Sequence, residues 1–349
     1  MAESTAQHPQ ISGAFFDQIL FGFAAPQALF TACELKIFDS LHEQPKSSSA
    51  LIEQLPAASE LRGLTILMDT LVTLGLLQKN TSVVPNLYEN TPTADRFLVS
   101  ASSSSITGFV KFVMMQQSYL NSTNFICAIK NEKALGKTWD HFYHSKEDLM
   151  IFQQGFDHLT SIEGPPLLSA FDLSAFNQVC DLGGATGRLA YEASNLYPNM
   201  KMTVFDLPQV IESASHFKPP ADEYPNQDNV TLISGDFFTD ELPKADLYTL
   251  RNIVHDWGDD KVDLLLEKVF KALPSGGGIL LGEMLMPEDK TGHLLSNILS
   301  MIMFMFCDTG AHERTAQEYT KLLQKHGFVD VQTRSTDAAL TDAILAIKP

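Results

Sequence analysis

The chain has 349 residues, of which 44% are hydrophobic, and this length and composition predict a globular protein with room for two domains. Its formal net charge of −18 argues against binding to nucleic acids and to anionic membranes, because both need basic protein surfaces. The four cysteines are widely spaced and form no metal-binding or disulfide pattern, which is typical of a reducing compartment.

The N-terminal segment predicts neither export nor membrane insertion. Its first residues are polar, and no basic stretch precedes an apolar run, so no secretory signal is expected. The apolar stretch at residues 15–41 is interrupted by Asp17, Pro26 and Glu34, which indicates packed helices rather than a membrane span. We therefore expect a cytoplasmic protein with no membrane segment.

Residues 1–165 follow helical rather than strand spacing. Apolar residues recur three and four positions apart in the segments 50–55, 61–77 and 148–160. Residues 47–91 predict two helices followed by a short extended pair, the pattern of a winged helix-turn-helix. The second helix offers only Arg62 as a basic residue, so contacts to DNA phosphates are not expected. Residues 1–165 are instead predicted to form a helical, winged-helix-like domain that dimerises and acts as a lid.

From about residue 177 the pattern changes to alternating strands and helices. Short apolar runs predict strands at residues 178–182, 202–206, 230–234, 245–250 and 278–283. Helical stretches separate these runs, which is the βαβ arrangement of a parallel sheet. The last two runs, residues 328–334 and 343–347, follow each other without a helix and predict a terminal β-hairpin. Residues 166–349 are therefore predicted to form an α/β, Rossmann-like domain.

The glycine-rich stretch QVCDLGGATGRLA follows the first predicted strand. A dinucleotide fingerprint needs glycines at relative positions one, three and six, but counting from Gly183 the later two positions hold Ala185 and Arg188. No Lys-Ser/Thr pair follows the loop, so it is not a P-loop either. Asp181 ends the strand at the mouth of the turn, where a carboxylate would repel a pyrophosphate and attract an ammonium group.

Acidic residues also end the next two predicted strands. Asp206 closes the second strand, where an acid can bind both ribose hydroxyls. Gly235 and Asp236 follow the third strand, and the neighbouring Phe237 is placed to lie against an adenine ring. Acids at three successive strand ends, beside a glycine loop that does not suit phosphate, predict S-adenosylmethionine, which is cationic and has no phosphate.

Six motifs extend this pattern along the chain: DLGGATG, FDLP, GDFF, HDW, GGGILLGE and HERT. With them the chain resembles the small-molecule O-methyltransferases, a family that includes plant caffeate and flavonoid enzymes and animal hydroxyindole enzymes. The animal type is more similar, through SAFDLSAF, VCDLGG and TDAILAIK. The resemblance continues into the N-terminal half in QALFTACELKIFDSL, so it covers nearly the whole chain.

The resemblance implies a class I methyltransferase domain behind a helical domain that forms an intertwined homodimer. It implies that the methyl donor is bound by Gly183, Asp206, Asp236, Phe237 and Arg251. Tyr143 matches the aromatic residue that covers the donor from the N-terminal domain. The chain departs from the animal enzymes at Thr160, where they have a tryptophan.

His255 follows the fourth predicted strand, at the sheet edge where ligands of such folds bind. A phenol with a pKa of ~10 is mostly protonated at neutral pH, and a histidine with a pKa of ~6.5 is a suitable acceptor for its proton. His255 is therefore the candidate general base. The resemblance implies that Glu283 and Glu313 frame it, with Glu313 as the orienting group. The adjacent His312 is expected to be structural or on the surface.

The acceptor side is predicted from two segments. Asp256 either caps the helix that begins near Asp259 or contacts the substrate. In residues 296–310, helical spacing places Met301, Phe304, Met305 and Asp308 on one face, most of it core or dimer interface. The resemblance places Phe304 and Asp308 where acetylserotonin enzymes carry amides, so these residues would weaken binding of an acetamide and favour an acceptor with a positive group.

Three functions remain open at this point. The first is O-methylation of a small phenolic or hydroxyindole metabolite, with S-adenosylhomocysteine as the second product and His255 as the base. The second keeps the donor but methylates a thioether sulfur or an amine, so that His255 only positions the acceptor. The third is a silent homologue or a DNA-binding sensor of the donor. No metal is expected, because the acids lie at successive strand ends and the histidines lack ligand spacing.

Overall fold

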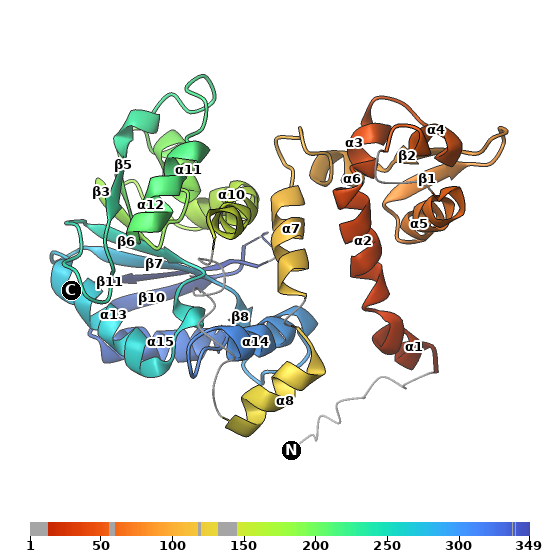
Figure 1. The fold of residues 1–349 in the computed structure, drawn as a ribbon. Helices are drawn as coiled ribbons and strands as arrows, with labels where there is room; N and C mark the ends of the chain where they lie inside the picture. The colour runs from red at the N-terminus through yellow and green to blue at the C-terminus, as the bar shows by residue number, and fades with distance from the viewer. Residues whose placement is uncertain (1–12, 56–59, 118–119, 132–144, 337, 339) are drawn as a thin grey trace, which may run out of the picture. The chain divides into compact units, whose positions relative to one another are not determined.

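The computed structural model describes residues 13–55, 60–117, 120–131, 145–336, 338 and 340–349 (Figure 1). Contacts between residues divide the chain into two compact units, Met1–Val110 and Lys111–Pro349. Helix α7 (Thr107–Gln116) runs across this division, and helix α10 (Lys146–Ser169) runs through the predicted boundary at residues 165 and 166. The division into a helical domain (residues 1–165) and a catalytic domain (residues 166–349) therefore stays a prediction.

The first unit is helical with one small hairpin. Its elements are α1 (Gly13–Phe21), α2 (Ala24–Glu34), α3 (Ile37–His42), α4 (Ser48–Ile52), α5 (Leu61–Thr73), β1 (Leu77–Asn80), β2 (Leu87–Asn90) and α6 (Pro92–Phe97). The predicted pair of helices followed by an extended pair is confirmed by α4, α5 and the antiparallel strands β1 and β2. Ser47 and Glu60 cap these two helices, because their side chains accept hydrogen bonds from first-turn backbone N–H groups.

The second unit is built on a seven-stranded sheet in the order β10-β11-β7-β6-β3-β4-β5. The strands are β3 (Gln178–Leu182), β4 (Lys201–Asp206), β5 (Val230–Ser234), β6 (Leu247–Arg251), β7 (Gly278–Glu283), β10 (Val329–Arg334) and β11 (Asp342–Ile347). Strands β3 to β7 pair in parallel, and β10 and β11 form an antiparallel hairpin whose second strand pairs with β7. The predicted parallel strands and the terminal hairpin are thus confirmed.

Alternating side chains bury both faces of this sheet. Cys180 and Leu182 of β3 pack in one core cluster, whereas Val179, which points to the opposite face, packs in another. The first cluster is covered by α13 (Asp259–Ala272) and α15 (Ala316–Lys325), and the second by α10 and α11 (Arg188–Leu196). Because helices cover both faces of the sheet, the loops that follow the parallel strands lie together at the carboxyl edge, where ligands of such folds bind.

The remaining elements are α8 (Ser122–Asn131), α12 (Pro208–Ala214), α14 (Leu294–Phe306), the short strands β8 (Leu285–Met286) and β9 (Arg314–Thr315), and the 3₁₀ turns η1 (Ser215–Phe217), η2 (Gln227–Asn229) and η3 (Val254–Asp256). Within the part of the chain that the structure describes, no helix combines the length and the apolar character needed to cross a bilayer.

Candidate active site

The glycine loop after β3 is shaped by close neighbours. Gly183 has a φ of +72°, and a Cβ atom there would lie 2.4 Å from Cδ1 of Ile253. Gly187 has a φ of +81° and precedes α11. Both positions favour glycine, because L side chains rarely adopt this conformation. The contact with Ile253 also places the loop against the turn that carries His255.

Asp206 ties this loop to β4. Its Oδ2 accepts the backbone N–H of Ala185 at 2.8 Å, and its Oδ1 accepts that of Leu207 at 2.7 Å. Burial raises the pKa of Asp206 to about 6, against the opposing effect of these two hydrogen bonds. Each carboxylate oxygen retains a further lone pair that can accept a ligand hydroxyl.

The segment after β5 completes this edge. A Cβ atom on Gly235 would lie 2.3 Å from Cζ of Phe205, so the backbone passes directly over that ring. Asp236 holds its own turn, since its Oδ1 accepts the backbone N–H of Phe238 at 2.8 Å. The ring of Phe237 lies 3.7 Å from the position of a Cβ on Gly183. We call the residues Gly183, Asp206, Gly235, Asp236 and Phe237 the donor edge.

Two residues predicted to hold the donor have different surroundings. Asp181 is 2% exposed and accepts the Thr249 hydroxyl at 2.6 Å, so it lies buried beneath the loop, and its role toward the donor stays a prediction. Burial raises its pKa to about 7. The guanidinium of Arg251 is also buried, and it donates to Thr160 at 2.9 Å and to Glu163 at 2.7 Å. Tyr143 lies outside the described residues.

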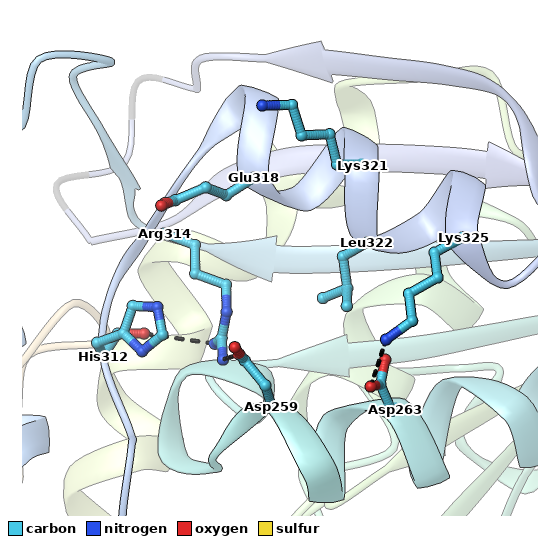
Figure 2. Close-up of a pocket in the computed structure, with 8 residues that line it drawn as sticks. All are labelled: Asp259, Asp263, His312, Arg314, Glu318, Lys321, Leu322 and Lys325. Carbon is cyan, nitrogen blue, oxygen red and sulfur yellow. Dashed lines mark hydrogen bonds and ion pairs between the residues drawn. The ribbon is translucent and has the colours of Figure 1, made fainter.

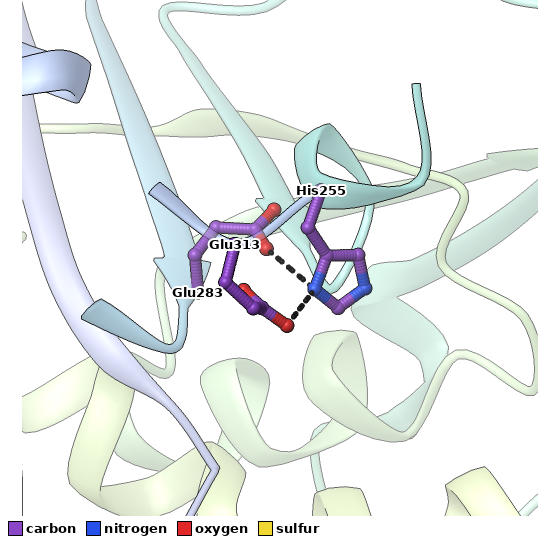
Figure 3. A group of neighbouring side chains, drawn as sticks. All are labelled: His255, Glu283 and Glu313. Atoms are coloured by element: carbon purple, nitrogen blue, oxygen red, sulfur yellow. Dashed lines mark hydrogen bonds and ion pairs between the residues drawn. The ribbon is translucent and has the colours of Figure 1, made fainter. Parts of the chain in front are cut away.

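The predicted catalytic residues come together from three separate segments (Figure 3). Nδ1 of His255, in η3, lies 2.9 Å from Oε1 of Glu313 and 3.4 Å from Oε2 of Glu283. On the other side of the ring, Nε2 lies 3.5 Å from Oδ1 of Asp256. We call these four residues the His255 cluster. The geometry agrees with the expectation that Glu313 orients the ring, because it makes the shorter contact.

Glu283 and Arg314 both hold the turn in place through its backbone. Oε1 of Glu283 accepts the backbone N–H groups of Ile253 at 3.0 Å and Val254 at 2.7 Å. Arg314 donates to the carbonyl of Val254 at 3.1 Å and to that of Trp257 at 3.2 Å. The turn that carries His255 is therefore fixed by hydrogen bonds to its backbone.

Arg314 also faces a surface pocket, which Figure 2 shows. The pocket is lined by Asp259, Asp263, His312, Arg314, Glu318, Lys321, Leu322 and Lys325. Most of its charges are paired, with Arg314 on Asp259 and Lys325 on Asp263. His312 lines this pocket rather than the His255 cluster, in agreement with its expected structural or surface role.

The His255 cluster is rich in negative charge. Burial alone would lower the pKa of His255, but Glu313, Glu283 and Asp256 outweigh it and raise the pKa to about 10. Burial raises the pKa of Glu283 to about 7. Oε2 of Glu283 and Oε2 of Glu313 are buried and accept no hydrogen bond from the described residues.

The ligand atoms of His255, Glu283 and Glu313 lie within 4.8 Å of one another and could hold a metal ion, so the expected absence of a metal stays a prediction.

Near the acceptor, the structure excludes one of the two alternatives predicted for Asp256 and corrects the helical placement of Asp308. Asp256 does not cap α13, whose N-cap is Gly258 with no side-chain hydrogen bond; its Oδ1 accepts the thiol of Cys307 at 3.0 Å instead. Helix α14 ends at Phe306, because Cys307 is extended, so Asp308 lies in the following loop rather than on the helical face.

Asp308 is also paired. Its Oδ1 lies 2.9 Å from Nζ of Lys261, a residue that the sequence analysis did not single out. Forty-seven residues separate the two, and local sequence carries no signal for such a pair. Phe304 lies within α14 and packs edge-on against Phe125 of α8, with ring centres 6.2 Å apart.

Comparison with known proteins identifies the family. Residues 119–329 match the O-methyltransferase domain, and residues 17–100 match the O-methyltransferase dimerisation domain. The acetylserotonin O-methyltransferase of Macaca mulatta is 37% identical over 337 residues, which cover 94% of this chain and 95% of that enzyme. The human enzyme of the same name is 36% identical over 337 residues, with the same coverage.

Solved structures agree. The crystal structure of human N-acetylserotonin methyltransferase in complex with SAM has a TM-score of 0.87 and 34% identity, and the match covers 98% of this chain and 99% of that chain. A structure described as PigF with SAH has a TM-score of 0.84 at 21% identity and shows the same fold. The chain therefore belongs to the O-methyltransferase family.

Proposed function

We propose that this protein transfers a methyl group from S-adenosylmethionine to the hydroxyl of a small phenolic or hydroxyindole metabolite and releases S-adenosylhomocysteine. The observation that carries the proposal is the His255 ring, whose Nδ1 lies 2.9 Å from the carboxylate of Glu313 and whose Nε2 makes only a longer contact, 3.5 Å, with Asp256. The relatives named above point to the same class of reaction.

The donor edge fits S-adenosylmethionine. The backbone passes so close to Ile253 at Gly183 and to Phe205 at Gly235 that no side chain fits there. Asp206 would hold the ribose hydroxyls, and Phe237 would lie against the adenine. The bound donor supplies an electrophilic methyl group on a sulfonium. Asp181 and Arg251 would support the donor-binding loops from beneath rather than contact the donor. Their side chains already form hydrogen bonds, Asp181 with Thr249 and Arg251 with Thr160 and Glu163.

His255 removes the proton from the acceptor. A glutamate carboxylate can only accept a hydrogen bond, so the contact with Glu313 keeps a proton on Nδ1, and the neutral form of the ring carries its lone pair on Nε2. An acceptor hydroxyl that reaches Nε2 loses its proton to it as the oxygen attacks the methyl group. The carboxylates of the cluster stabilise the imidazolium that forms, and such general-base help contributes about 10²–10⁴ in rate.

The raised pKa of His255 changes the expected pH dependence. A free histidine with a pKa of ~6.5 would become active as a base near neutral pH. The surrounding carboxylates move the pKa to about 10, so the neutral ring becomes more populated as the pH rises through the alkaline range. Turnover is therefore expected to rise with pH beyond neutrality. A thioether acceptor has no proton to lose, and its methylation would lack this dependence.

We also infer that the protein is a cytoplasmic homodimer with its helical domain in residues 1–165 and its catalytic domain in 166–349. Residues 17–100 match a dimerisation domain. The exposed apolar side chains of the first unit support this proposal, since Ile19, Leu20 and Phe21 are 60–66% exposed. Light scattering of the purified protein is expected to give a mass twice that of the 38.6 kDa monomer. The mass of a monomer would contradict the proposed dimer.

The proposed activity is tested by release of S-adenosylhomocysteine from S-adenosylmethionine by the purified protein. The acceptor panel contains hydroxyindoles, catechols, simple phenols, amines and thioether acids. Turnover with a phenol or hydroxyindole is expected. Turnover with thioethers or amines alone would contradict both the acceptor class and the role of His255 as base.

A further inference from the structure

The ion pair between Lys261 and Asp308 joins two segments on the acceptor side. Nζ of Lys261, in the first turn of α13, lies 2.9 Å from Oδ1 of Asp308, in the loop after α14. The same ammonium group lies 4.7 Å from the centre of the Trp257 ring and 5.9 Å from that of Phe238. An acid and two aromatic rings thus hold the positive charge of Lys261 beside Asp308.

The backbone of Asp308 is tied to Asp256, the residue that faces Nε2 of the His255 ring. The two glutamates of the cluster occupy the Nδ1 side, whereas Nε2 faces Asp256. The side chain of Asp256 accepts the Cys307 thiol at 3.0 Å, and its carbonyl accepts the backbone N–H of Asp308 at 3.0 Å. An acceptor hydroxyl must reach Nε2, and the residue beside that nitrogen is hydrogen-bonded to both Cys307 and Asp308.

The loop that carries Asp308 is packed tightly against the turn. A Cβ atom on Gly258 would lie 2.3 Å from the carbonyl oxygen of Thr309, and one on Gly310 would lie 3.3 Å from Cα of Gly258. Only glycine allows these two backbones to approach so closely. The carboxylate of Asp308 is therefore held at a fixed place relative to His255.

The charge of Asp308 matters at this place. Its side chain is 17% exposed and that of Lys261 is 34% exposed, so water screens the pair only in part. Without a counter-charge, the carboxylate of Asp308 would attract an acceptor bearing an ammonium group. With Lys261 at 2.9 Å, the charge of Asp308 is cancelled.

We propose that Lys261 determines acceptor specificity by neutralising Asp308, so that the acceptor is a hydroxy compound without a positive charge. This inference rests on the proposed function and narrows its acceptor class. It reverses the sequence-based expectation that an acid at position 308 favours a positively charged acceptor. Lys261 acts through Asp308, and is therefore a specificity-determining residue rather than a catalytic one.

The test compares two acceptors that share a 5-hydroxyindole and differ in charge, one with an aminoethyl side chain and one with its N-acetylated form. Dissociation constants are measured with S-adenosylhomocysteine bound, because binding can be read whether or not turnover occurs. In Lys261→Met, the ratio of the two constants is expected to shift about tenfold towards the cationic acceptor, the size of change that one uncompensated, partly screened charge produces. In the double variant Lys261→Met/Asp308→Asn the ratio should return to the wild-type value.

The matched control is Lys271→Met. Lys271 lies on the same helix and pairs with Glu267 on the surface, where its side chain is 72% exposed, so this variant should leave the ratio unchanged. An unchanged ratio in Lys261→Met, with binding retained, would overturn the proposal, and so would a protein that binds neither acceptor. If the ratio shifts as expected but no acceptor is methylated, the specificity role holds and the proposed catalytic activity fails.

Discussion

The donor edge and the His255 cluster use buried carboxylates in different ways. At the donor edge, both oxygens of Asp206 accept backbone N–H groups, and the carboxylate fixes the loop that it supports. In the His255 cluster, three carboxylates surround a single imidazole, and Oε2 of both Glu283 and Glu313 accepts no hydrogen bond from the described residues. A buried carboxylate that accepts two backbone N–H groups, such as Asp206, supports the loop around it. Several buried carboxylates around one imidazole instead favour the protonated ring.

The difference assigns one task to each region. In the donor edge, the carboxylate of Asp206 is held by two backbone N–H groups of the chain itself, so it is suited to hold a molecule that does not exchange protons with the protein. The His255 cluster is suited to accept a proton, because its negative charge stabilises a positive ring. Variants in one region should therefore change donor affinity, and variants in the other should change turnover and its pH dependence.

The largest effect is expected from His255→Ala. Loss of the base should lower kcat by about 10²–10⁴, while the dissociation constant of S-adenosylhomocysteine stays close to that of the wild type. Single-turnover kinetics and calorimetry measure the two quantities. His312→Ala, which removes a ring outside the cluster, should leave both within about threefold of the wild type. Equal turnover in His255→Ala and the wild type would remove His255 as the base.

A smaller and opposite pattern is expected from Asp206→Ala. Two backbone N–H groups lose a charged acceptor, so the donor should bind about 10–100-fold more weakly, with little change in kcat at saturating donor. Titration of S-adenosylhomocysteine checks this, with Asp228→Ala as a control because that side chain is 95% exposed. A large fall in kcat with unchanged donor affinity would contradict the division between the two regions.

The donor edge could be predicted from the sequence almost completely. Its residues lie directly after strands whose apolar runs are unmistakable, and parallel strands bring their carboxyl ends to one edge of a sheet. Asp181, which is not part of the donor edge, could not be placed in the same way. The sequence pattern of an acid at a strand end is the same whether the side chain faces the loop or lies buried beneath it. Only the tertiary contact with Thr249 shows that Asp181 is buried.

The acceptor side could be predicted only in outline. The resemblance placed His255, Glu283 and Glu313 together, although they are far apart in sequence. It could not show that α14 ends before Asp308 or that Lys261 pairs with it, because both depend on how the loop at Thr309 packs against Gly258. Long-range ion pairs leave no periodic signal.

Stability measurements sharpen the comparison further. Gly183→Ala should lower the free energy of unfolding by about 1–3 kcal/mol, since it combines a left-handed backbone with a collision against Ile253. Gly292→Ala has a similar φ of +81° but no neighbour within 4 Å, so it should cost only the backbone strain, about 1 kcal/mol. Urea unfolding gives both values. Equal costs would show that the collision relaxes freely.

A separate effect concerns the pH dependence of stability at Asp181. Its pKa is about 7 in the folded protein, against ~3.9 in an unfolded chain, so the folded state holds its proton more tightly and stability falls as the pH rises between these values. Asp181→Asn removes this loss, about 4 kcal/mol at pH 7, and should raise Tm near pH 7, relative to pH ~4, by about 5 °C. Thermal unfolding at several pH values checks the slope; parallel curves for the variant and the wild type would contradict the assignment.

The most direct test of the account is the pH profile of kcat/KM for a neutral 5-hydroxyindole acceptor, measured for the wild type and for Glu313→Gln. The carboxylate of Glu313 raises the pKa of His255, so its loss should move the rising limb of the profile to lower pH and lower the plateau rate. The acceptor's own pKa is the same in both experiments and cannot produce such a shift. A rising limb at the same pH in both proteins, or a flat profile in the wild type, would contradict the claim that His255 takes the acceptor's proton.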